Sequence, residues 1–459
     1  MISLSPHWCS GAVLQHGAVQ QLSGQAAAHS VIDITLSSPS QTITVQCQAD
    51  NTGCWQAELP AQPPSGPYTL TLCAPAQPTL SYQDLWFGEL LLFAGQSNVG
   101  WPLAQYPAQL AAAQQMLSTA SGSRDDIRCF LSDPTDFRAP GRWQTLDANH
   151  CAQWPALLYH FANHCPQTTL RFGLVDLSWP GSAMDAWSAT AAGAPAQHAW
   201  QAGALFSARL APWLARPFNT LVWYQGEQDA MSRQADAYAG KLQAWITSCR
   251  QYAQWELPLI LVQIAGFGAS LPAKPKDGFV QVRQAQQQLA ASTPNCALVC
   301  AADLGDATDI HPAHKAELAR RLMLTWVALR SANAAAHAQA PAKVGLLEAT
   351  LLRDDQTTGA YQLQLPDLTD GDHWQNYPTT ESAAASSLRH AAPDSGFYCL
   401  TDTAQCLAVA VTCHANYLHM HLPQQARWLA YGMAPNPQLC WYTSEGLPLL
   451  PQIWQLDDL

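Results

Sequence analysis

Charged side chains are scarce in this chain of 459 residues: only 12% are Asp, Glu, Lys or Arg, against about 25% in a typical soluble protein. Basic residues are the rarer kind, with 21 Lys and Arg against 33 Asp and Glu, which gives a net charge of −12. Phosphate backbones and anionic membranes require a basic surface, so neither nucleic acid nor a membrane is an expected partner. Because 48% of the residues are hydrophobic, the low charge indicates an uncharged surface rather than disorder.

Long apolar runs are also missing, since none approaches the roughly 18 residues of a membrane-spanning helix. Residues 1–12 lack the basic start and apolar stretch of a signal peptide, so we expect a cytoplasmic protein, or a periplasmic or secreted one if a leader has been removed. The 14 cysteines are scattered, and only Cys296 and Cys300 lie closer than five residues apart. This spacing does not match a cysteine motif that binds a metal ion. It predicts that the cysteines are reduced and mostly buried.

The hydrophobic pattern divides the chain into three regions, consistent with a length about three times that of a typical domain. Residues 1–85 alternate short apolar runs with turn residues, which predicts an antiparallel β module. Residues 86–330 alternate buried strands with helical stretches, which is typical of an α/β fold with a largely parallel sheet. An Ala-rich linker at 331–343 leads to a second β-rich region at 344–459, in which 379–387 is expected to be a loop. The strands expected in the central region are 89–94, 170–177, 220–224, 258–264 and 297–301.

The first candidate for chemistry is Ser97, which follows the strand at 89–94 and a glycine, Gly95. This position puts the hydroxyl at the carboxyl end of a parallel sheet, where open α/β folds have their active sites. A following helix would aim backbone N–H groups at the serine and favour an oxyanion there. The alternative is that Ser97 only caps that helix.

The second candidate is His311, which stands immediately before Pro312. Because proline can occupy the first turn of a helix, expected here over 313–329, the histidine would be held in a stiff loop end suited to a general base. The nearby carboxylates of Asp306 and Asp309 could orient the imidazole, as in a Ser-His-Asp arrangement. The alternative is a solvated acidic loop with a structural histidine.

Two more strands end in polar or glycine-containing turns. The strand at 220–224 leads into Gln225 and Glu227, whose side chains should be hydrogen-bonded because unpaired burial is costly. Gln225 could donate its amide N–H to an oxyanion. After 170–177, Gly181 could offer a backbone N–H where a side chain would block a substrate. Each turn alone could be an ordinary strand-to-helix connection, but one parallel sheet would collect all four motifs on one edge.

In their order along the chain, the four motifs resemble the sequence blocks of the SGNH hydrolase superfamily and, more narrowly, of the sialate O-acetylesterase family. The blocks are Gly95-Gln96-Ser97-Asn98, Ser178-Trp179-Pro180-Gly181-Ser182, Trp223-Tyr224-Gln225-Gly226-Glu227 and Asp309-Ile310-His311-Pro312. Similar stretches outside them are Gly11-Ala12-Val13-Leu14-Gln15, Gly88-Glu89, Val282-Arg283-Gln284-Ala285-Gln286 and Ser444-Glu445-Gly446-Leu447-Pro448. The resemblance covers nearly the whole chain and implies a flavodoxin-like parallel sheet flanked by β-rich regions.

The resemblance implies that Ser97 is the nucleophile and His311 the base of a serine esterase. The oxyanion hole would then consist of the N–H groups of Ser97 and Gly181 and the side chain of Gln225. Supporting positions of the same motifs are Gly95, Gln96, Asn98 and Glu227.

The sequence departs from the superfamily pattern in two places. The second block usually reads Gly-Gly-Thr, but Pro180 and Ser182 replace its first and last residues. The usual acid lies three positions before the histidine, where this chain has Thr308. Either Asp309 or Asp306 must therefore complete a triad, with Asp309 preferred, or the site works as a Ser-His dyad.

The implied function is carbohydrate O-acetylesterase, with sialate 9-O-acetylesterase first and an acetylxylan or other polysaccharide esterase second. Four aromatic residues beside the motifs could stack on a sugar, although core packing is the alternative: Trp101, Trp179, Trp187 and Tyr224. A sialate carboxylate would favour an arginine fork, for which Arg171 and Arg283 are candidates. The negative net charge makes a neutral acetylated sugar the rival substrate.

No cofactor or metal is expected for this chemistry. His419 and His421 would share one face of a strand, which we interpret as a solvated face rather than a metal site. The alternative hypothesis is a protein that binds glycans without catalysis. The two β regions and the 18 tryptophans favour it. That reading leaves Ser97 and His311 without a role.

Overall fold

The fold is described from a computed structural model. It describes residues 2–5, 8–119, 124–189, 196–232, 234–268, 277–335, 347–353, 360–366, 374–376, 396–401, 406–414 and 416–456. Contacts group the chain into two units, the first comprising Met1–Gln225 and Lys241–Ile260 and the second Gly226–Gly240 and Leu261–Leu459. Among the described helices, none is both long and apolar enough to cross a membrane. The 14 cysteines, all in described parts of the chain, are free thiols.

The first unit begins with short strands that pair antiparallel, except for Val13–Gln15, which pairs parallel with Trp86–Gly88 and so departs from the all-antiparallel module expected from the sequence. These strands are β1 (Ser3–Leu4), β2 (Val13–Gln15), β3 (Gln20–Gln25), β4 (Val31–Ser37), β5 (Thr42–Gln48), β6 (Cys54–Leu59) and β7 (Ser65–Cys73). Within one sheet β3 pairs with β1 and β6, and within the other β4 pairs with β5 and β7. Alternate side chains of β4, Ile32, Ile34 and Leu36, are fully buried, as the period of two predicts.

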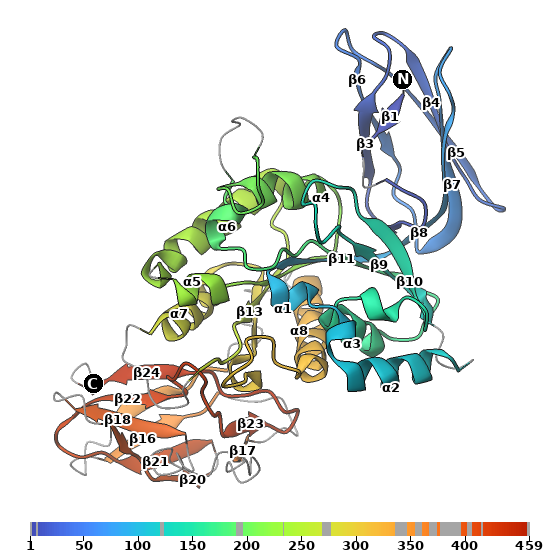
Figure 1. The fold of residues 1–459 in the computed structure, drawn as a ribbon. Coiled ribbons are helices and arrows are strands. Elements are labelled where there is room, and N and C mark those ends of the chain that lie inside the picture. The colour runs from blue at the N-terminus through green and yellow to red at the C-terminus, as the bar shows by residue number, and fades with distance from the viewer. Residues whose placement is uncertain are drawn as a thin grey trace. The chain divides into compact units, whose positions relative to one another are not determined.

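Strand β8 (Leu80–Gly95) is shared between the β module and the α/β region (Figure 1). Its first half pairs antiparallel with β7, and its second half pairs parallel with strands on both sides. The boundary expected after residue 85 therefore falls inside one continuous strand of 16 residues. Alternating exposure up to Phe87 gives way to complete burial from Gly88 to Gly95, which is typical of a strand with both faces covered.

The parallel sheet of the first unit runs in the order β10-β9-β11-β8-β12. Its further strands are β9 (Arg124–Leu131), β10 (Arg142–Leu146), β11 (Phe172–Asp176) and β12 (Thr220–Tyr224). Only β10 is antiparallel to its neighbour, β9. β11 and β12 lie on opposite sides of β8, so the order in which strands are added to the sheet reverses at β8. Open α/β sheets bind ligands at the carboxyl ends of strands at such a point.

Helices and short turns connect these strands. The α-helices described in the chain are α1 (Ser97–Gly100), α2 (Pro107–Leu117), α3 (Ala156–His164), α4 (Ala211–Leu214), α5 (Glu227–Met231), α6 (Tyr238–Ala253), α7 (Gly278–Ser292) and α8 (Lys315–Ala335). The single turns are η1 (Leu103–Gln105), η2 (Cys151–Gln153), η3 (Met184–Trp187), η4 (Phe206–Leu210), η5 (Ala235–Ala237) and η6 (Ala302–Leu304). The combination of sheets and helices expected from the sequence is confirmed.

Strands β13 (Leu259–Gln263) and β14 (Cys296–Cys300) also match the expected positions. In the second unit, α7 and α8 both contact β14. Helix α8 begins at Lys315, two residues later than expected, and continues through 331–335 of the expected linker. Its apolar stripe is buried as its spacing predicts, at Leu318, Leu322, Trp326 and Leu329. The rest of the expected linker, 336–343, lies outside the described residues.

The C-terminal part of the second unit is built from strands, as expected (Figure 1). They are β15 (Thr350–Arg353), β16 (Ala360–Gln364), β17 (Trp374–Asn376), β18 (Phe397–Thr401), β19 (Cys406–Ala408), β20 (Val411–His414), β21 (Tyr417–His421), β22 (Ala426–Tyr431), β23 (Trp441–Thr443) and β24 (Gln452–Gln455). Their orders are β15-β16-β21-β20, β17-β23 and β19-β18-β22-β24. The loop expected at 379–387 lies outside the described residues.

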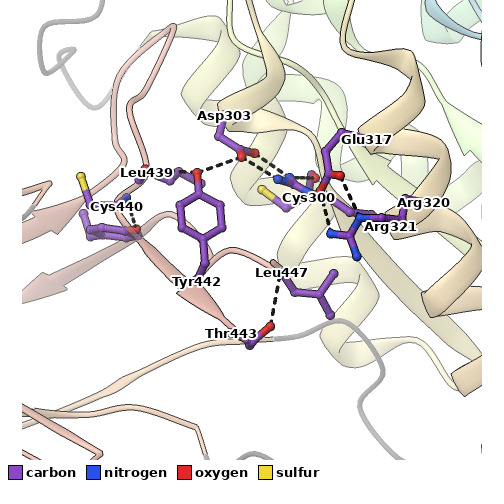
Figure 2. Close-up of polar contacts among 11 residues, drawn as sticks. Cys300, Asp303, Glu317, Arg320, Arg321, Leu439, Cys440, Tyr442, Thr443 and Leu447 are labelled. Carbon is purple, nitrogen blue, oxygen red and sulfur yellow. Dashed lines mark hydrogen bonds and ion pairs between the residues drawn. The ribbon is translucent and has the colours of Figure 1, made fainter. Parts of the chain in front are cut away.

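A polar network joins β23 to α8 and to the turn that follows β14 (Figure 2). The Tyr442 hydroxyl donates to Oδ2 of Asp303 at 3.0 Å. Arg321 donates to both oxygens of the same carboxylate at 2.7 Å and also binds Glu317. The side chains of Arg321 and Asp303 are 3% and 7% exposed, so water screens this pair little. The network therefore anchors the C-terminal strands to the start of the segment that leads to His311.

We predict that Tyr442→Phe lowers the free energy of unfolding by about 1–3 kcal/mol, because a buried carboxylate loses one hydrogen-bond donor. Denaturant unfolding of the purified protein measures the effect. The control is Tyr252→Phe, which removes the same hydroxyl from a side chain that is 52% exposed and should leave stability unchanged. Equal stability of Tyr442→Phe and the wild type would contradict the prediction.

Candidate functional site

The end of β8 brings two motif loops of the first unit together. Gly95 has a φ of +138°, and a Cβ at this position would lie 2.0 Å from the carbonyl oxygen of Tyr224. Only glycine fits so close an approach. The N–H of Gln96 donates to that same carbonyl at 3.1 Å. The serine loop is therefore held directly against the end of β12.

Ser97 is the first residue of α1, and the residue at the cap position is Gln96, whose side chain makes no capping bond. The alternative hypothesis, that Ser97 only caps the helix, does not hold, because Gln96 occupies the cap position. Helix α1 has only four residues, so the expected contribution of a helix dipole is confined to one turn. Ser97 is 6% exposed and Asn98 is buried. The carbonyl of Ser97 accepts the N–H of Trp101 at 2.7 Å, which closes the turn.

The second motif loop continues the pairing of β11 with β8 beyond the end of the strand. Trp179 donates its backbone N–H to the carbonyl of Gly95 at 2.9 Å. Gly181 has a φ of +64°, in the left-handed region that favours glycine. Ser182 donates to the carbonyl of Trp179 at 2.8 Å and accepts the indole N–H of Trp187 at 2.9 Å. A closed loop therefore forms even though Pro180 and Ser182 replace the usual residues.

Gln225 ties the third motif to the second. Its side chain is fully buried, and its Nε2 donates to the carbonyl of Ser182 at 3.1 Å. The expectation of a common edge is thereby confirmed for the three motifs of the first unit, which carry Ser97, Gly181 and Gln225. Backbone N–H groups and a side-chain amide are the kinds of donor that an oxyanion-stabilising site uses.

Two buried charged residues that contact the second motif loop, Asp176 and Arg209, were not among the residues selected from the sequence. Asp176, the last residue of β11, accepts the N–H of Ser178 at 3.0 Å, and Arg209 donates to the Ser178 carbonyl at 2.9 Å. The guanidinium also lies 4.7 Å from the centre of the Trp179 ring. Burial raises the pKa of Asp176, against the lowering effects of Ser178 and Arg209. Asp176 could have been found as a carboxylate at a strand end, but no local pattern marks Arg209.

The aromatic candidates for sugar binding separate by burial. Trp187 and Tyr224 are 0% exposed and belong to the core, so the core alternative holds for them. Trp179 is 7% exposed, and Trp101 is half-buried. The ring beside Trp179 is Trp200, which is 60% exposed at a centroid distance of 6.4 Å and was missed by the sequence analysis. Exposed tryptophans offer the flat apolar surface on which sugars stack.

In the second unit, the two candidate acids take different positions around His311. Oδ1 of Asp306 accepts the N–H groups of Thr308 and Asp309 at 2.7 and 2.9 Å, which makes it the anchor of a turn and lowers its pKa. Oδ1 of Asp309 accepts the N–H of His311 at 2.8 Å and lies 3.8 Å from its Nδ1. That separation is an ion-pair distance rather than a hydrogen bond. Asp309 is therefore the acid next to the imidazole.

A buried lysine accompanies this histidine, and the sequence analysis missed it. Lys315 begins α8, four residues after His311, and is 1% exposed. Burial lowers its pKa to about 8, against the opposing effects of Glu227 and Asp309. Burial and the Lys315 charge together lower the pKa of His311, while Asp309 raises it. The position of Lys315, four residues after His311 and near the expected start of a helix, was the only signal in the sequence. That position does not predict that the lysine is buried.

Both arginines considered for a sialate carboxylate are engaged elsewhere. Arg283 is 2% exposed and donates to the carbonyls of Ala434 and Pro435 at 2.7 and 2.9 Å. Arg171 lies 4.1 Å from the ring centre of Trp86 and precedes β11, at the amino end of the strand. Ser97, by contrast, follows the carboxyl end of β8. The structure therefore contradicts a substrate-binding role for Arg283 and gives none to Arg171.

The two histidines of β21 share a strand face, as expected. His419 is half-buried and His421 exposed, while Leu418 and Met420 point to the interior. Within the described residues, no group of three or more His, Cys, Asp or Glu side chains is placed to hold a metal ion.

Comparison with known proteins assigns the chain to a family. Residues 88–326 match the family model described as carbohydrate esterase, sialic acid-specific acetylesterase. The chain belongs to this family. The resemblance to sialate O-acetylesterases expected from the motifs is thus confirmed, and the protein is an esterase of the carbohydrate esterase class.

Solved structures add information on the fold. A carbohydrate acetylesterase from Xanthomonas citri is similar over 99% of this chain and 100% of its own length, with 23% identity and a TM-score of 0.79. A protein from Arabidopsis thaliana matches 52% of this chain and 98% of its own, with 18% identity and a TM-score of 0.36. Among curated proteins, none matches the sequence significantly. The Xanthomonas structure shows that the fold of this carbohydrate esterase is shared along nearly its whole length.

We predict that Asp309→Asn shifts the acid limb of the kcat/KM profile to lower pH. The Asp309 charge raises the pKa of His311, so its removal lets the imidazole lose its proton at lower pH. For a base at His311, the same change should lower kcat at least about tenfold, because the imidazolium would lose its counter-charge. Acetate release measured from pH 5 to pH 9 tests both effects.

The matched control is Asp306→Asn. An asparagine Oδ1 can accept the same two N–H bonds that Asp306 accepts, so the turn persists and the acid limb should stay in place. If both variants move the limb alike, Asp309 has no special relation to His311.

Proposed function

We propose that this carbohydrate esterase is an SGNH-type O-acetylesterase in which Ser97 is the nucleophile and His311 the general base. The observation that supports it most is the hydrogen-bonded edge that carries Ser97, Gly181 and Gln225. The strand order supports the SGNH assignment. Motif-bearing strands β11, β8 and β12 follow the flavodoxin-like pattern 2-1-3, with β9 and β10 added at one edge.

In the proposed reaction, the Ser97 oxygen attacks the acetyl carbonyl while its proton passes to Nε2 of His311. The N–H groups of Ser97 and Gly181 and the amide of Gln225 bind the oxyanion; loss of one such donor costs about 100- to 1000-fold in kcat. The bond between the acetyl carbon and the sugar oxygen then breaks, and the imidazolium gives its proton to that oxygen, so the sugar leaves with a hydroxyl group. Water then attacks the acetyl-serine by the same route and releases acetate.

The electrostatics around His311 suit a base. A group that accepts a proton must be neutral beforehand, and burial together with Lys315 holds the pKa of His311 below its ordinary value of 6.5. The imidazole is then mostly neutral at pH 7. The proposal requires its Nε2 to meet the Ser97 hydroxyl in the active enzyme.

The substrate class divides into two candidates. The family description names sialic acid, which favours 9-O-acetylated sialic acid as the substrate. The internal contacts of Arg283 and Arg171 favour instead a neutral acetylated sugar, such as acetylated xylan, because both guanidinium groups already have partners within the protein.

We predict that Ser97→Ala keeps the fold and abolishes acetate release, because no other group in the proposed mechanism attacks the ester. Labelling with an organophosphonate ester, followed by mass spectrometry, should place the adduct on Ser97. His311→Ala should suppress this adduct, since the serine then lacks its base. Undiminished acetate release by Ser97→Ala would refute the mechanism, and absence of labelling in the wild type would favour a non-catalytic glycan-binding protein.

The substrate prediction concerns the sialate carboxylate. We expect kcat/KM for 9-O-acetylated sialic acid and for its methyl ester to differ by less than about threefold, because a carboxylate read by an arginine would contribute about tenfold or more. Acetylated xylo-oligosaccharides serve as the neutral reference. A large loss on methylation would show that a cation reads the carboxylate and would favour the sialate-specific assignment.

A further inference from the structure

Trp200 is the most exposed of the large apolar residues in the described parts of the chain, at 60%, and the proposed mechanism gives its indole no task. A single exposed apolar side chain needs no explanation by itself, so its place in the fold decides what it can do. The ring lies beside the second motif loop, because its Nε1 is 3.9 Å from the point where a Cβ on Gly181 would stand. Trp200 therefore borders the loop that offers a proposed oxyanion donor.

Trp179 is the buried neighbour of this exposed ring. The two rings meet edge to face, with centroids 6.4 Å apart and an interplanar angle of 70°. The backbone N–H of Trp179 donates to the carbonyl of Gly95 at 2.9 Å. The guanidinium of Arg209 lies 4.7 Å from the centre of the Trp179 ring, and the Phe137 ring is centred 6.2 Å away. Trp200 therefore contacts a side chain that is held on several sides and tied to the serine loop.

Hydrogen bonds also hold the turn that carries Trp200. Before the tryptophan, the N–H of Gln197 donates to Oε1 of Gln201 at 3.0 Å. After it, the N–H of Gly203 donates to the carbonyl of Asp185 at 2.9 Å, which joins the turn to η3. The backbone on both sides of the indole is thus fixed, and a preorganised ring loses little conformational freedom when it binds a ligand.

We propose that Trp200 is a stacking platform for the pyranose ring from which acetate is removed. The flat apolar face of an indole can cover the C–H face of a pyranose and release water from both surfaces. The inference rests on the proposed function, because it assigns the ring beside Gly181 to hold the sugar while Ser97 attacks the acetyl group. Trp200 is then a specificity-determining residue that favours esters of ring sugars over small acyclic esters.

The first test compares Trp200→Ala with the wild type on acetylated xylo-oligosaccharides, on 9-O-acetylated sialic acid and on ethyl acetate, which has no ring to stack. For at least one of the two sugars KM should rise about tenfold, with a smaller change in kcat, because a contact made before and during the reaction is lost. The ratio of kcat/KM for that sugar to kcat/KM for ethyl acetate should fall about as much. The variant should fold, since most of the Trp200 side chain is exposed.

Two variants serve as controls. Trp200→Phe keeps an aromatic face and should restore most of the preference for the sugar. Trp255→Ala removes another tryptophan of the first unit, 38% exposed, and should leave the ratio unchanged. The Trp255 ring is centred 5.3 Å from that of Phe218, which precedes β12, so it lies at the opposite end of this strand from Gln225.

Sugar binding without catalysis gives a second measurement. Deacetylated xylo-oligosaccharides and free sialic acid carry no ester, so their binding can be measured whether or not the protein is an esterase. In NMR spectra of protein labelled at tryptophan, the Trp200 indole signal, identified by its loss in Trp200→Phe, should shift as one of these sugars is added. Calorimetry should show that Trp200→Ala raises the Kd for that sugar about tenfold.

The outcomes separate the inference from the proposed function. A folded Trp200→Ala that keeps the wild-type KM for both sugar esters, or an indole signal that neither sugar shifts, would overturn the inference. An equal loss on ethyl acetate would overturn it too, since the residue would then act on the motif loop and not on the sugar. A wild type that releases no acetate would overturn the proposed function, while the sugar titration would still decide whether Trp200 binds a sugar ring.

Discussion

The close approach of Gly95 to the carbonyl of Tyr224 is the constraint on which the edge that carries Ser97, Gly181 and Gln225 depends. A side chain at this position would lie 2.0 Å from that oxygen, so the end of β8 could not meet the end of β12. The same glycine accepts the N–H of Trp179, and the loop so held presents Gly181 and binds Gln225 through the carbonyl of Ser182. Backbone groups provide most of these links, which makes the edge insensitive to the identity of neighbouring side chains.

The second unit relies on a different principle, the pairing of buried charges. Few residues of the chain are charged, yet several of these lie in the interior, among them Arg321, Asp303, Lys315 and Glu227. Removing one partner of such a pair costs more than the pair contributes, so each member constrains the other. The segment from β14 to α8, which carries His311, is bordered by such charges at both ends.

Much of the fold follows from the sequence because buried strands leave a continuous apolar run. Residues 220–224 coincide with β12, since both faces of this strand are covered. The boundary expected after residue 85 falls inside β8, because this strand passes from one sheet into another without a break. Ser97, Gly181 and Gln225 follow the ends of β8, β11 and β12, as the sequence predicts.

Other parts of the site could not be predicted because they depend on burial and on distant contacts. Arg283 looked like a ligand-binding arginine, but the carbonyls that hold it come from residues about 150 positions later. Trp187 and Lys315 stand next to motifs, and nothing in the sequence separates the exposed neighbours of a motif from the buried ones.

Trapping the acyl-enzyme tests the central claim most directly. The wild-type protein is mixed with an activated acetyl ester, quenched in acid within the first turnover and digested for peptide mass spectrometry. The account predicts an acetyl group on Ser97 that disappears as acetate is released. Acetate released without any acetylation of Ser97, or an acetyl group on a different residue that turns over at the catalytic rate, would contradict it.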